Sequence, residues 1–168
     1  MNYVNHFQHA DDVIAHLNTV ILAIDNPLLQ AKYVGFVSIA AATVYEQAVK
    51  EIFINFAKRK HKVLGNFTEV YFHRINGKIK IKVIHDEYIS KFGDKYQKRF
   101  KKKLEKASKD YLVANKRDLK SSYANLITWR NDFAHEGKIN STTTYREVVQ
   151  AYEDGKEVIH CLAETMTR

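Results

Sequence analysis

The amino-acid sequence predicts an all-α fold, an up-and-down bundle of about five helices forming one domain over residues 1–168. Three observations support this prediction. Apolar residues recur at helical spacing along most of the chain, the sequence contains one proline and six glycines, and 45% of its residues are hydrophobic. Few helix breakers together with a large apolar fraction are typical of long helices packed around a core.

The first two helices are expected from about Val4 to Ile24 and from about Pro27 to Lys60. Asn26 followed by Pro27 supplies a capping side chain and a proline at the first helical position, which is a favoured helix start. The second helix is long, about 50 Å at 1.5 Å per residue. No signal-peptide pattern precedes it, and no run of about 18 apolar residues predicts a membrane span.

A carboxylate interrupts one of the apolar stripes of the second helix. Ile39, Ala42, Val49 and Phe53 share one helical face, and Glu46 falls between Ala42 and Val49 on that face. Because a carboxylate on an apolar face is costly without a hydrogen-bond donor, Glu46 requires a partner.

The helical pattern weakens between His61 and Lys82. Asn76-Gly77 is a turn signal, and apolar residues alternate after it. A short hairpin near residues 70–84 is therefore one expectation, and a helix followed by a loop is an equal one. A short helix or turn is expected next, from Asp86 to Phe92.

The excess positive charge is concentrated in one segment. Lys95 to Lys120 contains eleven Lys and Arg against three acids, whereas sixteen basic and sixteen acidic residues lie outside it. A helix starting at Gly93-Asp94 carries much of this charge, with an apolar stripe from Tyr96 to Tyr111. Two alternatives explain this concentration of lysines. The segment is either a solvated helix face or a surface that binds the phosphate backbone of a nucleic acid. The candidate RNA-binding residues are Lys98, Arg99, Lys101, Lys102, Lys103 and Lys106.

The next helix is expected from about Asp118 to His135, with Gly137 as a natural residue just past its end. Its apolar stripe has Arg130 where the periodicity predicts leucine. After a polar link, Thr144 and Glu147 have capping-box spacing and start a last helix.

Arg130 and Glu46 are thus two charged residues on two apolar stripes. The simplest solution is that they pair, because buried charges persist when paired and a guanidinium can hold a carboxylate through two hydrogen bonds. A buried salt bridge would explain the pair completely. In the functional alternative, the carboxylate orients Arg130 toward a phosphate.

The stretch around Arg130 is the candidate site. Asn131 and His135 are four residues apart and share a helix face, whereas Arg130 and His135 are about 140° apart at 100° per residue. A distorted last turn between Ala134 and Gly137 would bring them together. A two-fold pairing of two copies, each contributing to a shared cleft, is the preferred expectation.

Arg130-Asn131-Asp132-Phe133-Ala134-His135 resembles the Arg, polar residue, His motif of the HEPN superfamily, which are all-helical domains. The wider pattern is similar to the HEPN branch associated with RNA ligase and phosphatase systems, in which the long second helix carries a glutamate, here Glu46.

The resemblance implies metal-independent cleavage of single-stranded RNA by the neighbouring 2′-hydroxyl, with no cofactor. It makes His135 the general acid or base, Arg130 the group that stabilises the phosphorane, and Asn131 a positioning residue, with Glu46 and Asp132 in support. It further implies a homodimer with a composite site, a toxin or phage-defence setting, and an antitoxin or other regulatory protein as partner. The alternative is a non-catalytic HEPN module that binds RNA or a nucleotide, or that serves as a partner-binding scaffold.

The remaining candidate groups are weaker. His6 and His9 lack further ligands at a metal-binding spacing, so no metal site is expected. Cys161 is the single cysteine, which excludes an internal disulfide, and it is interpreted as a core thiol in a protein of the reducing cytoplasm.

Overall fold

The computed structural model describes residues 2–137 and 142–167, and every regular element in these ranges is a helix. The α-helices are α1 (Phe7–Val20), α2 (Pro27–Lys60), α3 (Lys62–His73), α4 (Ile81–Val83), α5 (Asp94–Asn115), α6 (Leu119–Glu136) and α7 (Tyr145–Thr165). Shorter 3-10 or π turns lie at Asn2–His6, Ile21–Ala23, Ile84–Tyr88 and Ile89–Phe92. The all-α prediction is therefore confirmed, with seven α-helices in the described ranges instead of about five.

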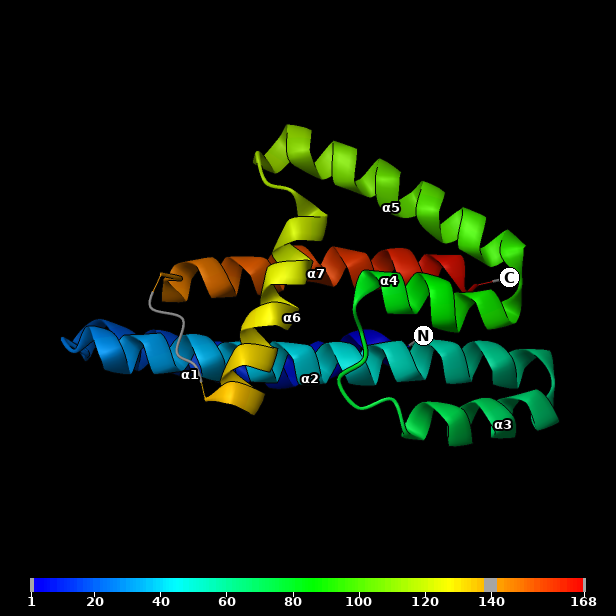
Figure 1. The fold of residues 1–168 in the computed structure, drawn as a ribbon, viewed down its shortest axis with the longest axis horizontal. Coiled ribbons are helices and arrows are strands. Elements are labelled where there is room, and N and C mark those ends of the chain that lie inside the picture. The colour runs from blue at the N-terminus through cyan, green and yellow to red at the C-terminus, as the bar shows by residue number, and fades with distance from the viewer. Residues whose placement is uncertain (1, 138–141, 168) are drawn as a thin grey trace.

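Helix α2 is the centre of the bundle (Figure 1). It contacts α1, α3, α6 and α7, and α6 lies across both α2 and α7. Helix α5 packs mainly on α7, and α3 folds back along the end of α2. Because α2 is covered from several directions, both of its apolar stripes are buried, as the two-stripe pattern predicts.

Three buried tyrosines join the three helices that meet at the centre. The ring of Tyr45 on α2 stacks on Tyr123 of α6 at 5.6 Å and on Tyr152 of α7 at 5.7 Å, measured between centroids. The hydroxyl of Tyr45 donates to the carbonyl of Tyr152, and the hydroxyl of Tyr123 donates to the carbonyl of Ile79 at 2.7 Å. These bonds satisfy two buried hydroxyls, and they join α2 to α7 and α6 to the segment before α4.

Two of the predicted helix starts are confirmed, whereas the first helix is shorter than expected and has 3-10 turns on both sides of α1. The Asn26 side chain accepts hydrogen bonds from the backbone N–H groups of Leu28 and Leu29, so α2 begins at Pro27 as expected. Thr144 and Glu147 form a complete capping box at the start of α7.

The hairpin near residues 70–84 does not form in the described structure, and the alternative of a helix followed by a loop is correct. Helix α3 runs to His73, and the backbone then turns through Gly77, which has φ +69°. Ile75 and Ile79 are both buried in the core, because the segment packs on the bundle instead of pairing with a second strand.

Helix α2 is also long and apolar enough, by length and composition alone, to cross a membrane. Half of its most apolar window is buried inside the bundle, and a core helix passes the same test. The apolar character of α2 is accounted for by its central position in the core.

Candidate active site

The last turn of α6 carries the candidate site. Asp118 caps the start of the helix, because its side chain accepts the Ser121 N–H at 2.7 Å. It ends at Gly137, which has a φ of +62° and donates its N–H to the carbonyl of Asp132. This left-handed residue ends the helix directly after the motif, as the position of the glycine predicts.

Arg130, Asn131 and His135 meet within a single chain. Nη1 of Arg130 donates to Oδ1 of Asn131 at 3.0 Å and lies 3.1 Å from Nε2 of His135. A second copy is therefore not required to bring the three side chains together. The preferred expectation, that Arg130 and His135 meet only through a two-fold pairing of two copies, was wrong. Arg130 and His135 are about 140° apart around the helix axis, and the arginine side chain is long enough to reach the imidazole across this angle.

The contact with Arg130 defines the role of Nε2 in His135. A guanidinium has only donors, so Nε2 is the acceptor in this arrangement. A neutral ring then carries its proton on Nδ1. An imidazole with a free electron pair at Nε2 has the form required of a general base.

Glu46 and Arg130 do not form the expected ion pair in the described structure. Oε1 of Glu46 pairs with Nζ of Lys50 at 2.7 Å, and Oε2 accepts the backbone N–H of Gly77. The loop after α3 comes between the two charged residues, because a Cβ built on Gly77 would lie 3.0 Å from Nη1 of Arg130. Glu46 is therefore connected to the candidate site only through the Gly77 loop.

Gly77 lies beside the candidate site, and the sequence analysis assigned it only to a turn, in either a hairpin or a loop after a helix. Its positive φ and its close approach to Arg130 both favour glycine, since a Cβ would be strained and would crowd the guanidinium. The Asn76-Gly77 dipeptide was the signal, and it indicated the turn correctly without indicating what the turn contacts.

A tight helix crossing positions the end of α6. The ring of Phe133 lies against Gly35 of α2 so closely that a Cβ on Gly35 would be 2.2 Å from the ring. Phe133 also meets the ring of Phe36 edge to face at 5.6 Å between centroids. The backbone of the motif is thus held on α2, while His135 itself is exposed.

The other predicted residues have mixed environments. Asp132 is half-buried, and its carbonyl takes part in ending the helix. Lys103 pairs with Glu164 and Lys106 pairs with Asp110, each at 2.5 Å, so these two cations are partly neutralised. The other four members of the set, which are Lys98, Arg99, Lys101 and Lys102, make no ion pair with any residue that the structure describes.

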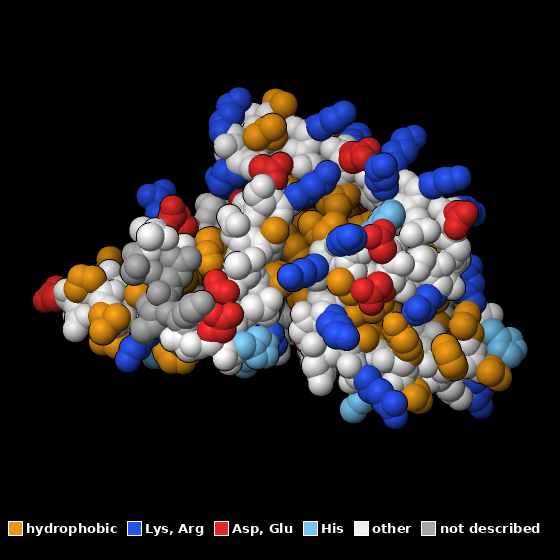
Figure 2. Space-filling view, viewed as in Figure 1, with side chains coloured by type: hydrophobic (Ala, Val, Ile, Leu, Met, Phe, Trp, Pro, Cys, Tyr) orange, Lys and Arg blue, Asp and Glu red, His pale blue; other side chains and the backbone are white. Residues whose placement is uncertain are grey.

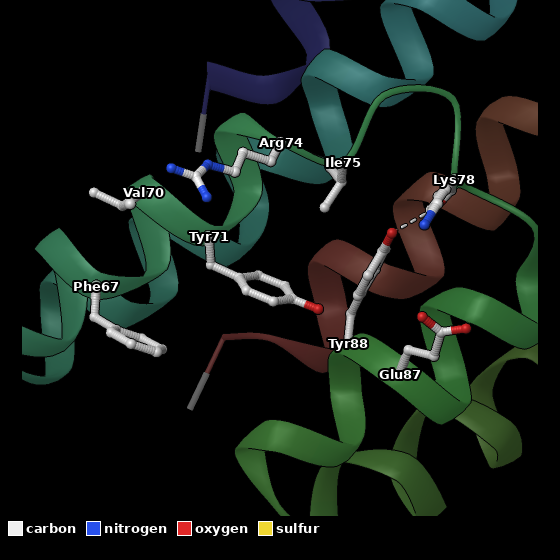
Figure 3. A pocket seen from close by; sticks show the side chains of 8 residues that line it. All are labelled: Phe67, Val70, Tyr71, Arg74, Ile75, Lys78, Glu87 and Tyr88. Carbon is white, nitrogen blue, oxygen red and sulfur yellow. Dashed lines mark hydrogen bonds between the residues drawn. The ribbon is translucent and has the colours of Figure 1, made fainter.

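A separate pocket of about 440 Å³ lies between α3 and the helical segment after α4 (Figure 3). Tyr71 and Tyr88 point into it, and the hydroxyl of Tyr88 donates to the carbonyl of Lys78 at 2.8 Å. Arg74 lies at its rim on α3. The pocket shares no residue with the Arg130 site, although Lys78 directly follows Gly77.

No group of three or more His, Cys, Asp or Glu side chains is placed to hold a metal ion in residues 2–137 and 142–167. His6 bonds instead to Glu51 of α2 at 2.7 Å. Cys161 is buried, and burial raises the pKa of its thiol to about 12, which agrees with a core thiol.

An all-helical bundle in which the last turns of α6 present Arg130, Asn131 and His135 is consistent with the HEPN class. The model of the RiboL-PSP-HEPN family matches residues 5–168, and the chain belongs to this family. Domains of this family are typically ribonucleases. Comparisons with curated proteins and with solved structures gave no match.

Proposed function

We propose that this protein is a metal-independent endoribonuclease that cleaves single-stranded RNA. The observation that carries the proposal is the Arg130–His135 contact of 3.1 Å at an exposed helix end. Arg130 makes no ion pair with any described carboxylate, so the guanidinium keeps a full charge to offer to a phosphate. The chain also belongs to a family whose members are typically ribonucleases, and this membership supports the same proposal.

In the proposed reaction, Nε2 of His135 takes the proton of the 2′-hydroxyl, and the 2′ oxygen attacks the adjacent phosphorus. The bond from phosphorus to the 5′ oxygen breaks, and that oxygen takes up a proton from a protonated imidazole. The products carry a 2′,3′-cyclic phosphate and a 5′-hydroxyl, so no water is consumed in this step. Arg130 stabilises the charge that develops on the phosphorane oxygens.

Substrate binding rearranges the contacts of Arg130. The bound phosphate attracts the guanidinium and frees Nε2 of His135 for the 2′-hydroxyl. Asn131 orients the guanidinium through the hydrogen bond of 3.0 Å from Nη1 to its Oδ1. Glu46 holds the Gly77 turn that supports the same guanidinium.

The direct test is incubation of the purified protein with total RNA and tRNA in EDTA, followed by mapping of the cut sites and their end groups. We expect 2′,3′-cyclic phosphates and 5′-hydroxyls from the wild type, and no cleavage by Arg130→Ala or His135→Ala. His16→Ala, which removes an exposed histidine of α1, is the matched control and should cleave normally. Cleavage that survives in both site variants would contradict the assignment of the activity to Arg130 and His135, and no cleavage by the wild type would favour the non-catalytic binding or scaffold role.

The proposed enzyme is a homodimer in which the ends of α6 from two copies face one cleft. Exposed apolar side chains on α2 support this: Phe36, which contacts Phe133 of the motif, is 51% exposed, and Leu28, about two turns earlier, is 60% exposed. The second copy then supplies the protonated imidazole for the leaving oxygen. Light scattering should give twice the chain mass for the wild type and a monomer for Phe36→Lys, and a monomeric wild type would contradict the dimer.

The proposed setting is a toxin or phage-defence effector of the reducing cytoplasm, restrained by an antitoxin or regulatory protein. Induced expression should then arrest growth, and the arrest should require both Arg130 and His135. Arrest by the His135→Ala protein would contradict this setting.

A further inference from the structure

A groove lies along α6 between the basic helix and Arg130, and we call it the α6 groove. It consists of two adjoining hollows of about 570 and 280 Å³ that share Ile81, Lys82 and Ala124. The larger hollow is lined by α4, α5 and α6, and the smaller one continues along α6 to Thr128. Figure 2 shows a hollow with a hydrophobic floor beside α6, with Lys or Arg side chains along its rim.

The rim of the α6 groove carries more positive than negative charge. Lys80, Lys82, Lys101 and Lys120 line it, and none of them pairs with an acid in the described part of the chain. The two acids in the lining are Asp86 and Glu105, and Asp86 is bonded to His85 at 2.5 Å. The remaining positive charge suits a polyanion.

The floor of the groove is apolar and partly aromatic. Phe100 and Leu104 of α5 contribute to the floor, together with Ile127 of α6. The half-buried ring of His85 lies over Phe100, with 6.4 Å between their centroids. A cationic rim around an apolar floor is the arrangement that binds single strands, with phosphates on the rim and unstacked bases on the floor. Paired bases in a duplex do not present their faces to such a floor.

The groove leads to the candidate active site. Ile127, which lines the smaller hollow, lies three residues before Arg130 on a neighbouring face of α6. Lys80 also lines the smaller hollow and follows three residues after Gly77, where an added Cβ would lie 3.0 Å from Nη1 of Arg130. From Lys120 to Arg130 the helix rises about 15 Å at 1.5 Å per residue.

We infer that the α6 groove binds the single strand of RNA that flanks the scissile phosphate. Lys82, Lys101 and Lys120 hold successive phosphates and deliver the strand to Arg130. The inference rests on the proposed function for the cleavage step, but binding in the groove can be measured without cleavage. The inference also reduces the set of candidate RNA-binding residues on the basic helix. Lys101 lines this groove, and the other five candidates do not.

The test measures binding of a fluorescent single-stranded RNA to the His135→Ala protein, in which cleavage cannot obscure binding. One variant adds Lys82→Gln, Lys101→Gln and Lys120→Gln. The matched control adds Lys62→Gln, Lys95→Gln and Lys109→Gln, which removes equal charge from exposed positions of α3 and α5 that line no hollow described above. We expect the groove variant to weaken binding roughly tenfold or more, and to reduce the slope of log K against log salt by about two, while the control changes little. Circular dichroism verifies that both variants are folded.

Equal losses in the two variants would overturn the inference, because they would show that RNA binds the basic surface in general. A poly-glutamate peptide that competes as strongly as RNA of equal charge would also overturn it, in favour of an acidic protein segment as the ligand. If the groove variant alone loses RNA binding while the wild type cleaves nothing, the groove inference stands and the nuclease proposal fails.

Discussion

The two ends of α6 each have an arginine nearby, and the two arginines have opposite kinds of neighbours. Arg117, just before the helix, pairs with Asp154 of α7 at 3.0 Å, and the Asp154 side chain is only 1% exposed. Arg130, in the last turns, contacts an amide oxygen, an imidazole nitrogen and the Gly77 backbone, with no described carboxylate in ion-pair range.

The pair near the start of α6 is saturated. Besides Arg117, the hydroxyls of Tyr111 and Ser122 and the amide of Gln150 donate to the Asp154 carboxylate. Burial alone would raise the pKa of Asp154, but these hydrogen bonds outweigh burial and hold the pKa below its ordinary value. The hydrogen bonds of Arg117 to Asp154 and to Tyr111 raise the pKa of Arg117 further. A charge with all of its partners inside the protein contributes to the fold and has nothing left for a ligand.

The comparison teaches that the partner, more than the arginine itself, separates a structural role from a functional one. Both arginines are partly buried and both lie beside helix ends. Only Arg130 has neutral neighbours that orient it without neutralising it, which is the condition for binding a phosphate.

The largest expected effect is on catalysis. Arg130→Ala should lower the single-turnover rate of RNA cleavage by about 10²–10³-fold, because it removes the cation that stabilises the transition state. Its free energy of unfolding should change by less than about 1 kcal/mol, since no ion pair is broken. Urea unfolding followed by circular dichroism provides the second measurement, and a large loss of stability would make Arg130 a structural residue like Arg117.

The converse substitution should affect stability. Arg117→Ala should lower the free energy of unfolding by about 2 kcal/mol, less than the roughly 3–5 kcal/mol of a fully buried pair, because the Arg117 side chain is 37% exposed. Arg117→Lys keeps the charge and should lose less. The cleavage rate per folded molecule should be unchanged in both variants, so a selective loss of cleavage would contradict the comparison.

A smaller, mixed effect is expected at Gly77, which has φ +69° and touches Arg130. Gly77→Ala should lower the free energy of unfolding by about 1–2 kcal/mol through backbone strain and slow cleavage roughly tenfold by displacing the guanidinium. Gly93→Ala is the matched control, because Gly93 also has a positive φ, +105°, but a Cβ added there would meet nothing within 4 Å. The Gly93→Ala protein should lose stability and keep its cleavage rate. Equal slowing of cleavage in both variants would exclude a positioning role for Gly77.

The smallest effect concerns acid stability. The pKa of Asp154 is lowered in the folded state, so its contribution is present above the unfolded value, near 3.8, and is lost as the pH falls through the folded value. Asp154→Asn should be less stable at pH 7 and should lose less stability than the wild type on further acidification. Asp118 and Glu147 also have lowered pKa values and keep part of the acid dependence. If the free energy of unfolding falls with pH in parallel for the wild type and Asp154→Asn, Asp154 is not a main source of the acid dependence.

Local patterns predicted much of the fold, because their causes are local. Asn26 and Pro27 determine the start of α2, and Thr144 with Glu147 determines the start of α7, through bonds within a few residues. The prediction for Glu46 was half right. A carboxylate on an apolar face did require donors, but Lys50 and the backbone of Gly77 supply them instead of Arg130.

The sequence by itself determined that the chain is helical, where most helices begin and end, and that Arg130, Asn131 and His135 are the candidate chemistry. Only the tertiary structure decided that these three side chains meet within one chain, that Gly77 lies between Glu46 and Arg130, and that Arg117 is the saturated arginine. The physical reason is range. Periodicity and capping depend on neighbours a few residues away, whereas the partner of a charge depends on how distant segments pack.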